Sequence, residues 1–128
     1  MLDPSFDPLN IAYVEDRIDT EISNNAKIEN INFQNDKISI KAKSSGSSFL
    51  VLSEVFYPLR WKVKINGNES KTLKVNNVIR GVILNDGENN INFYYDKSSF
   101  NMGLLISIIA FIISFIFIFY GKLIIRKK

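Results

Sequence analysis

An uncharged apolar run near the C-terminus constrains this chain more than any other feature. Residues 102–121 read MGLLISIIAFIISFIFIFYG, and Lys122 and the basic triplet 126–128 follow. Twenty helical residues at about 1.5 Å each extend roughly 30 Å, which matches the hydrocarbon core of a bilayer. The run therefore predicts a transmembrane helix over 101–121 and a basic tail over 122–128, with the lipid bilayer as a partner.

Charge is divided unevenly on the two sides of this run. Four of the 16 Lys and Arg residues follow it, so residues 1–100 hold 12 cations beside all 13 Asp and Glu residues. Because cations that flank a span stay in the cytoplasm, we expect residues 1–100 outside and the C-terminus inside. The preceding 100 residues are near neutral, which argues against nucleic acid as a partner.

Export of such a domain needs a signal, and residues 1–5 show neither a basic region nor an apolar region. Two interpretations remain open. The domain is cytosolic and the span is a tail anchor, or the chain is part of a longer protein whose earlier spans carry the domain across. We favour the longer protein, because a tail anchor would place the four C-terminal cations on the wrong side.

Residues 11–98 show the alternation of apolar and polar side chains that is typical of half-buried strands. Alternation is clearest over 37–43, 60–65 and 90–95, and it points the following side chains inward: Ile38, Ile40, Ala42, Trp61, Val63, Ile65, Ile91, Phe93 and Tyr95. Further strands are expected at 11–15, 27–34, 48–57, 71–75 and 78–84, with turns at 35–36, 44–47, 66–68, 76–77 and 85–87.

The fold class that follows is all-β. We expect a small antiparallel, jelly-roll-like β-sandwich over 11–98, an extended lead-in over 1–10, and the single C-terminal transmembrane helix. A short helix around 14–22 is the alternative for one segment. The segment 48–57 is apolar on both faces apart from Ser53 and Glu54, which predicts a central strand or a covering loop, or else an outer face that docks on a membrane-embedded partner.

Small residues form a stripe along the predicted span. Gly103, Ser107, Ala110 and Ser114 are spaced by four, three and four residues, which places them on one helix face. Such stripes let two helix backbones approach, and serine hydroxyls can bond across the contact. We expect packing against other transmembrane helices of the same or a partner protein, although small residues are also common in spans by chance.

The residue types argue against catalysis by this chain alone. Histidine and cysteine are absent, which removes the commonest general base and the thiolate metal ligands. The acidic run 15–21 lacks the glycine and the spacing of a calcium loop, so a solvated charge run is the simpler interpretation. We expect no catalytic residues, no metal site and no cofactor here.

Four residues are candidates for ligand binding: Tyr57, Trp61, Arg80 and Tyr94. Aromatic faces stack on sugar rings, but Trp61 shares a strand face with Val63, which favours core packing. Arg80 shares a face with two valines. If that face is buried, Arg80 must be paired, and Glu54 is the obvious partner. If it is wet, Arg80 could meet a phosphate on a lipid carrier.

A series of short segments occurs in a familiar order. They are Phe6-Asp7-Pro8, the LSEVFYP of 52–58, Trp61 with Asn66-Gly67, the VNNVIRGV of 75–82, Asp86-Gly87-Glu88, the NFYY of 92–95 and the SFNMG of 99–103. In this order they resemble the C-terminal region of bacterial multi-span membrane proteins of the YfhO type. Departures from that pattern include one extra residue between Pro58 and Trp61, and Asn89 where the family usually has histidine.

The resemblance implies a parent protein of the C-type glycosyltransferase class in the bacterial cytoplasmic membrane. Such proteins take sugars from polyprenyl-phosphate carriers and add them to cell-envelope polymers, with the catalytic acid in an early extracytoplasmic loop. This chain would then be a non-catalytic, extracytoplasmic β-domain plus the last span, with a lipid-linked sugar or envelope glycan as a further partner. The alternative is a self-standing membrane-anchored carbohydrate-binding or adhesion module.

Overall fold

The computed structural model describes residue 7, residues 11–23 and residues 25–125, with side chains up to residue 120. The chain divides into two compact units, residues 1–95 and residues 96–128. The described part of the first unit is an antiparallel β-sandwich of eight strands, and the second unit contains one long helix. An all-β sandwich followed by a single C-terminal helix is therefore confirmed.

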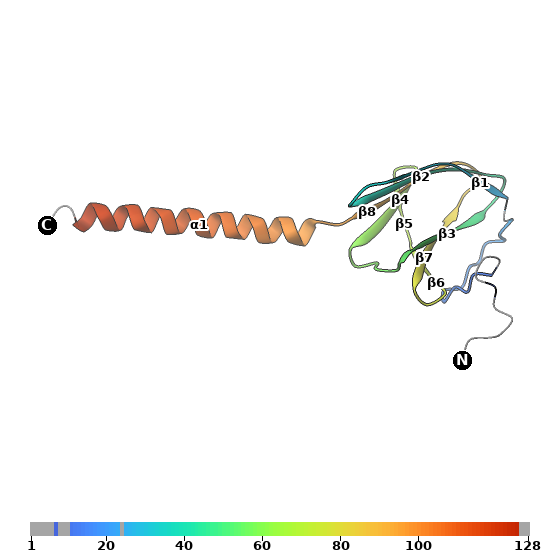
Figure 1. The fold of residues 1–128 in the computed structure, drawn as a ribbon, viewed down its shortest axis with the longest axis horizontal. Helices are drawn as coiled ribbons and strands as arrows, with labels where there is room; N and C mark the ends of the chain where they lie inside the picture. The colour runs from blue at the N-terminus through green and yellow to red at the C-terminus, as the bar shows by residue number, and fades with distance from the viewer. Residues whose placement is uncertain (1–6, 8–10, 24, 126–128) are drawn as a thin grey trace. The chain divides into compact units, whose positions relative to one another are not determined.

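Five strands form the larger sheet of the sandwich, with every neighbouring pair antiparallel (Figure 1). In spatial order they are β1 (Ala26–Phe33), β2 (Lys37–Ser44), β8 (Gly87–Tyr95), β4 (Trp61–Ile65) and β5 (Asn68–Ser70). The central strands show the alternation expected from sequence. Their inward residues Ile40, Val63, Ile91 and Phe93 are at most 2 % exposed, whereas Tyr95 at the end of β8 remains 39 % exposed.

Three strands form the smaller sheet, in the order β3 (Ser48–Val55), β7 (Ile79–Leu84) and β6 (Leu73–Val75). The prediction that residues 48–57 form a central strand is wrong, because β3 pairs with β7 alone in this sheet and lies at its edge. Its outward ring, Phe49, covers Gly81 on β7, where a Cβ atom would lie 2.6 Å from the ring. Apolar residues on the outer face of β3 are thus partly explained by contacts within the sheet.

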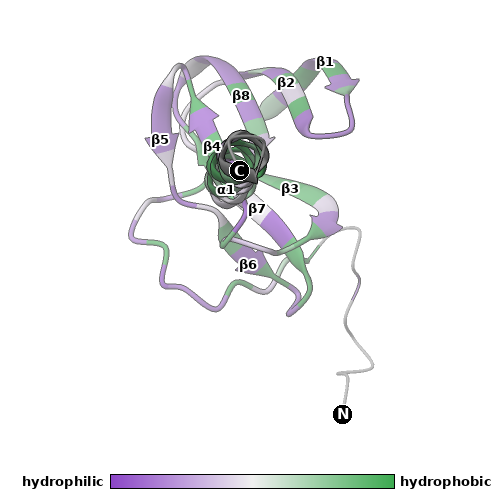
Figure 2. Cartoon of the chain, turned by 90° about the vertical axis from the view of Figure 1, so that its left-hand side faces the viewer, coloured by the Kyte–Doolittle hydropathy of each residue, from purple (hydrophilic) through white to green (hydrophobic). Residues whose placement is uncertain are grey.

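The chain alternates between the two sheets in the manner of a jelly roll: β2 and β4 belong to the larger sheet, and β3 between them belongs to the smaller one. The core lies between the layers and consists of Ile38, Ile40, Ala42, Leu50, Leu52, Val63, Ile65, Val82, Leu84, Ile91 and Phe93, with Trp61 packed against it. Strands coloured by hydropathy in Figure 2 show the same apolar and polar alternation. Burial of these side chains is the main stabilising contribution.

Strand β1 extends the larger sheet but is exposed along its whole length. Ile28 and Ile31 are three residues apart, so a regular strand would put them on opposite faces. A register shift between Ile28 and Asn30 restores the phase, and Ile31 pairs with the buried Ile40. The apolar side of β1 therefore continues the inner face of the sheet.

Asparagine and glycine close several turns through left-handed backbone. Asn66 and Gly67 have φ of 51° and 85° and connect β4 to β5 as a two-residue hairpin, which only such residues adopt at low cost. Asn89 is 1 % exposed and closes the β7–β8 turn. Its amide donates to the carbonyl oxygens of Asn85 and Gly87 and accepts from the Asn85 N–H.

The remaining segments differ from the sequence predictions in detail. Residues 11–15 contribute only a single bridge, between Val14 and Val75, and the described residues of 14–22 form no helix. Helix α1 spans Ser98–Ile125 and is long and apolar enough over 98–120 to cross a membrane. Its backbone begins three residues before the predicted span, and the tail residues 126–128 and most of the lead-in over 1–10 lie outside the described residues.

Candidate functional site

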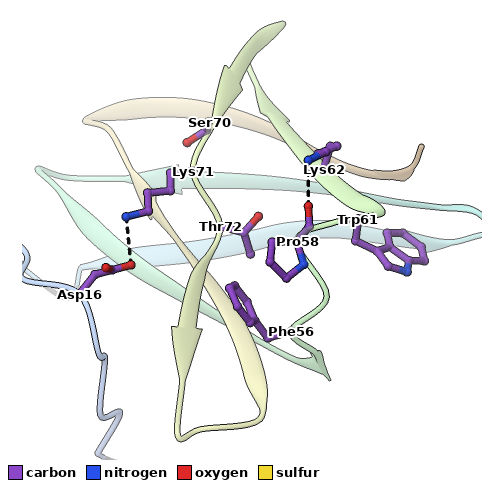
Figure 3. A pocket seen from close by; sticks show the side chains of 8 residues that line it. All are labelled: Asp16, Phe56, Pro58, Trp61, Lys62, Ser70, Lys71 and Thr72. Carbon is purple, nitrogen blue, oxygen red and sulfur yellow. Dashed lines mark hydrogen bonds and ion pairs between the residues drawn. The ribbon is translucent and has the colours of Figure 1, made fainter. Parts of the chain in front are cut away.

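A surface pocket of about 330 Å³ lies beside the loop that joins β3 to β4. Four separate segments build it: residue 16, the β3–β4 loop, the start of β4, and the stretch that joins β5 to β6. Its lining side chains are Asp16, Phe56, Pro58, Trp61, Lys62, Ser70, Lys71 and Thr72 (Figure 3). Two ammonium groups, two hydroxyls, aromatic rings and the Asp16 carboxylate thus share one pocket, in which the cations outnumber the acid.

Both lysines of the pocket already have partners. Lys62 Nζ donates to the Pro58 carbonyl oxygen at 2.8 Å, and Lys71 Nζ lies 3.1 Å from Asp16 Oδ2 (Figure 3). The Lys71–Asp16 side chains are 71 % and 47 % exposed, so this ion pair contributes little to stability. An incoming anion can therefore compete for Lys71 at small energetic cost.

Behind Trp61 lies Arg80, a buried guanidinium that is 2 % exposed on the inner face of β7. Its Cζ atom lies 4.5 Å from the ring centre of Trp61 and 5.2 Å from that of Phe93, within the range of cation–π attraction. Among the described residues, Arg80 Nε and Nη1 have no hydrogen-bond partner. Burial of these donors costs free energy that the aromatic contacts offset only in part.

Glu54 supplies the compensating charge. It lies in the register shift between Leu52 and Val55, and its Oε2 is 3.7 Å from Arg80 Nη2. This is the pair that the sequence suggested for a buried Arg80. Desolvation lowers the pKa of Arg80, and the Glu54 carboxylate acts in the opposite direction. The net destabilisation is present at neutral pH and is relieved only when the pH rises through the pKa of Arg80 in the folded protein.

The structure brings together some of the predicted binding residues and separates others. Trp61 lines the pocket and its ring stacks on Arg80, and the backbone N–H of Trp61 donates to the Tyr57 carbonyl oxygen at 2.9 Å. Tyr57 itself is 46 % exposed. Tyr94 is adjacent in sequence to the buried Phe93 and so lies on the other face of β8, where Lys64 Nζ is 5.6 Å from its ring. A single site that includes Tyr94 and Trp61 is therefore not formed.

Sequence reasoning missed most of the pocket. The alternation over 60–65 puts Lys62 on the face away from the core, and neither Lys71 nor Thr72 is among the predicted binding residues. No linear spacing links residue 16 to residues 56–62 and 70–72, and only the folded chain brings them together. The acidic run 15–21 is engaged in ion pairs, with Glu15 2.7 Å from Lys74 and Asp19 2.9 Å from Arg17. No group of metal-binding side chains was found in the described part of the chain.

The small-residue stripe of α1 has its own hydrogen bonds. Ser107 donates to the Gly103 carbonyl oxygen and Ser114 to the Ala110 carbonyl oxygen, each at 2.9 Å. The hydroxyl protons are thus used within the helix, and a facing helix would find two acceptors and a narrow groove. Along another side of the helix the ring of Phe115 is stacked on that of Phe119 and tilted against that of Phe111.

Comparison with known proteins gives one match. The model of a family described as "Bacterial membrane protein YfhO" matches residues 3–107. No curated protein and no solved structure matches the chain significantly. The family match begins ahead of the sandwich, covers all eight strands and continues into the first turns of α1.

Proposed function

The chain belongs to the YfhO family of bacterial membrane proteins, and from this we propose that it is the non-catalytic, extracytoplasmic β-domain and last span of a membrane glycosyltransferase-like protein. That protein would act on polyprenyl-phosphate-linked sugars for cell-envelope polymers in the bacterial cytoplasmic membrane. The β-domain would shape or stabilise the site that receives the carrier-linked sugar, and the span would pack against other transmembrane helices.

The observation that carries this proposal is the extent of the family match. It runs from residue 3 to residue 107 and so includes both the sandwich and the beginning of α1. The family match thus includes both the domain and the start of the span. A domain tied to a span works at the membrane surface, where the phosphate and sugar of a lipid carrier are also held.

The chemistry of the pocket supports the same ligand class. Lys62 and Lys71 could hold a phosphate, while the hydroxyls of Ser70 and Thr72 and the ring of Trp61 could contact a sugar. The second candidate function, a self-standing carbohydrate-binding module, is favoured by one fact: all eight pocket residues come from the β-domain itself.

A binding measurement separates the two functions. The full chain is reconstituted in lipid nanodiscs and titrated with a polyprenyl-phosphate-linked sugar or with soluble envelope glycan fragments, and the fluorescence of Trp61, the single tryptophan, is followed. We expect saturable binding of the carrier-linked sugar, weakened by Lys71→Met but not by Lys43→Met, an exposed lysine on β2. Equal binding of soluble glycans would favour the module, whereas binding of neither ligand would contradict the module and limit the proposed function to a stabilising role.

The proposed topology has a separate test, because the chain contains no cysteine. A single cysteine is placed at the exposed Asn68 or at the C-terminal Lys128, and intact spheroplasts are treated with a membrane-impermeant maleimide. We expect labelling of the Asn68→Cys variant, and labelling of Lys128→Cys only after permeabilisation. The reverse pattern would place the domain in the cytosol and would rule out the extracytoplasmic role.

A further inference from the structure

The two ends of the β-sandwich differ in polarity. At the end where β8 begins, the turns are made of polar and small residues: Ser45-Gly46-Ser47, Asn66-Gly67 and Asn85-Asp86-Gly87. Two of these turns are joined by a hydrogen bond, in which Asp86 Oδ1 accepts from the Gly46 N–H at 2.7 Å. This polar end has the composition of an ordinary water-facing surface.

At the other end, where β8 finishes at Tyr95, large apolar side chains are exposed. Leu59 is 72 % exposed at the tip of the β3–β4 loop, Val55 is 64 % exposed and Val78 is 58 % exposed. Tyr57 and Tyr95 are 46 % and 39 % exposed, and Trp61 is half-buried. We refer to these six residues, Val55, Tyr57, Leu59, Trp61, Val78 and Tyr95, as the apolar patch.

The patch is continuous across both sheets. Trp61 pairs with Tyr95 in the larger sheet, and their ring centres are 6.0 Å apart. The backbone N–H of Trp61 donates to the Tyr57 carbonyl oxygen and closes the turn between these two residues. The Phe56 N–H donates to the Val78 carbonyl oxygen at 2.7 Å and joins the loop to the start of β7. The six side chains therefore come from neighbouring strands and loops rather than from scattered positions.

Only two residues, Asp96 and Lys97, separate the patch residue Tyr95 from the first residue of α1. The Cα atoms of Tyr95 and Ser98 are three residue steps apart along the chain, so they lie within about 11 Å of each other. Asp96 Oδ1 accepts from the Ser98 N–H at 2.9 Å, which fixes the local start of the helix. The apolar end is thus the end that the covalent chain holds near the membrane.

We propose that the apolar patch rests in the headgroup layer of the bilayer, with Leu59 inserted and Tyr57, Trp61 and Tyr95 at the level of the polar groups. Tyrosine and tryptophan are enriched at this depth because one part of each ring is apolar and the other part forms hydrogen bonds. Leucine at an exposed loop tip has no favourable environment in water, but gains one in lipid.

Charges around the patch agree with a lipid surface. Arg60 and Lys62 flank the aromatic residues, and Lys97 follows Tyr95, whereas Glu54 faces Arg80. Long basic side chains can place their apolar stems against lipid while their charges reach phosphate groups. Asp96, Gln34-Asn35-Asp36 and Asn76-Asn77 are the polar neighbours at this end and would lie at its margin. This inference concerns lipid and holds whether or not the pocket binds a sugar.

The test uses Trp61 as a depth probe, because it is the single tryptophan of the chain. The full chain is reconstituted in phosphatidylcholine–phosphatidylglycerol vesicles that contain lipids brominated near the headgroup or near the bilayer centre. We expect strong quenching of Trp61 fluorescence by the shallow bromines, weak quenching by the deep ones, and severalfold less quenching by aqueous acrylamide than in the Leu59→Asp variant.

Asn68→Asp is the matched control, since it adds the same charge on an exposed residue near the polar end and should leave both quenching values unchanged. Far-UV circular dichroism in the same vesicles verifies the fold of each variant, and the wild-type quenching decides the question even if Leu59→Asp unfolds. Full access of acrylamide to Trp61 in the wild type, with no quenching by shallow bromines, would overturn the proposal. That result would favour a protein partner as the occupant of the apolar patch.

Discussion

The two units of this chain use apolar side chains in opposite ways. The β-sandwich has a core of its own, in which residues such as Ile91 and Phe93 are fully buried between the sheets. In α1 every side chain over 98–120 is exposed, although the helix is far more apolar than any strand. The sandwich is therefore stabilised by its own chain, whereas the helix requires lipid or neighbouring helices to cover it.

The largest difference in the free energy of unfolding should appear when one phenylalanine of each unit is replaced by alanine. Phe93→Ala deletes a ring that is fully buried, and we expect the free energy of unfolding of the β-domain to fall by about 3–5 kcal/mol. Phe115→Ala removes an exposed ring of α1 and should change that free energy by less than about 0.5 kcal/mol. Urea unfolding of the full chain in micelles, followed by Trp61 fluorescence, measures both. Equal losses would mean that the units are energetically coupled.

Substitution of one glycine in each unit should give a smaller difference in the free energy of unfolding. At Gly81, a Cβ atom would lie 2.6 Å from the Phe49 ring and 3.0 Å from the Leu50 carbonyl oxygen, whereas at Gly103 nothing lies within 4 Å. We expect Gly81→Ala to reduce the free energy of unfolding by about 1–3 kcal/mol and Gly103→Ala to leave it unchanged. Combining Gly81→Ala with Phe49→Ala should cost less than the sum of the two single losses. Strict additivity in the same urea titrations would contradict the steric explanation.

Arg80 is the one charged side chain that is buried among the described residues, and it tests whether the core of the β-domain tolerates an enclosed charge. Arg80→Met replaces the guanidinium with an apolar chain of similar length, so we expect stability to stay the same or to rise. Glu54→Gln leaves the guanidinium without its counter-charge. The carboxylate is half exposed and 3.7 Å away, so this loss should stay within about 1 kcal/mol. A large loss in Arg80→Met, measured by urea unfolding, would show that the stacking on Trp61 and Phe93 outweighs the desolvation.

Strand positions were predictable where one face of a strand is buried. The predicted segments 37–43, 60–65 and 90–95 correspond to β2, β4 and β8, because each alternates between a core face and a wet face. Strand β5, Asn68-Glu69-Ser70, was not predicted: its first residue falls in the predicted turn 66–68, and three exposed polar residues carry no alternation. The predicted strand over 11–15 is reduced to one bridge, because it faces the edge strand β6 with no partner on its other side among the described residues.

The candidate site was predictable only in part, for a different reason. Alternation placed Trp61 on the inner face, and charge balance paired Arg80 with Glu54, because both arguments depend on burial alone. The pocket depends on which loops meet, and the meeting of residue 16 with residues 56–62 and 70–72 follows from the topology of the two sheets. No pattern within a single strand contains that information.

The smallest effect is expected within α1, where helix packing is the proposed role of the stripe formed by Gly103, Ser107, Ala110 and Ser114. A photo-reactive amino acid is placed in the full-length protein at Ala110, or at Ile112 on the opposite side of the helix, and bacterial membranes are irradiated. We expect crosslinks to protein from position 110 and to lipid from position 112.

A substitution on the same face then measures the strength of that packing. Ala110→Leu fills the narrow groove with a larger side chain and should weaken helix association by about 1 kcal/mol, because close backbone approach supplies the packing contacts in lipid. The β-domain should unfold as in the wild type, since its core contains no residue of α1. Equal protein crosslinking from positions 110 and 112 would contradict a preferred packing face. The helix would then be an anchor whose apolar surface is covered by lipid on all sides.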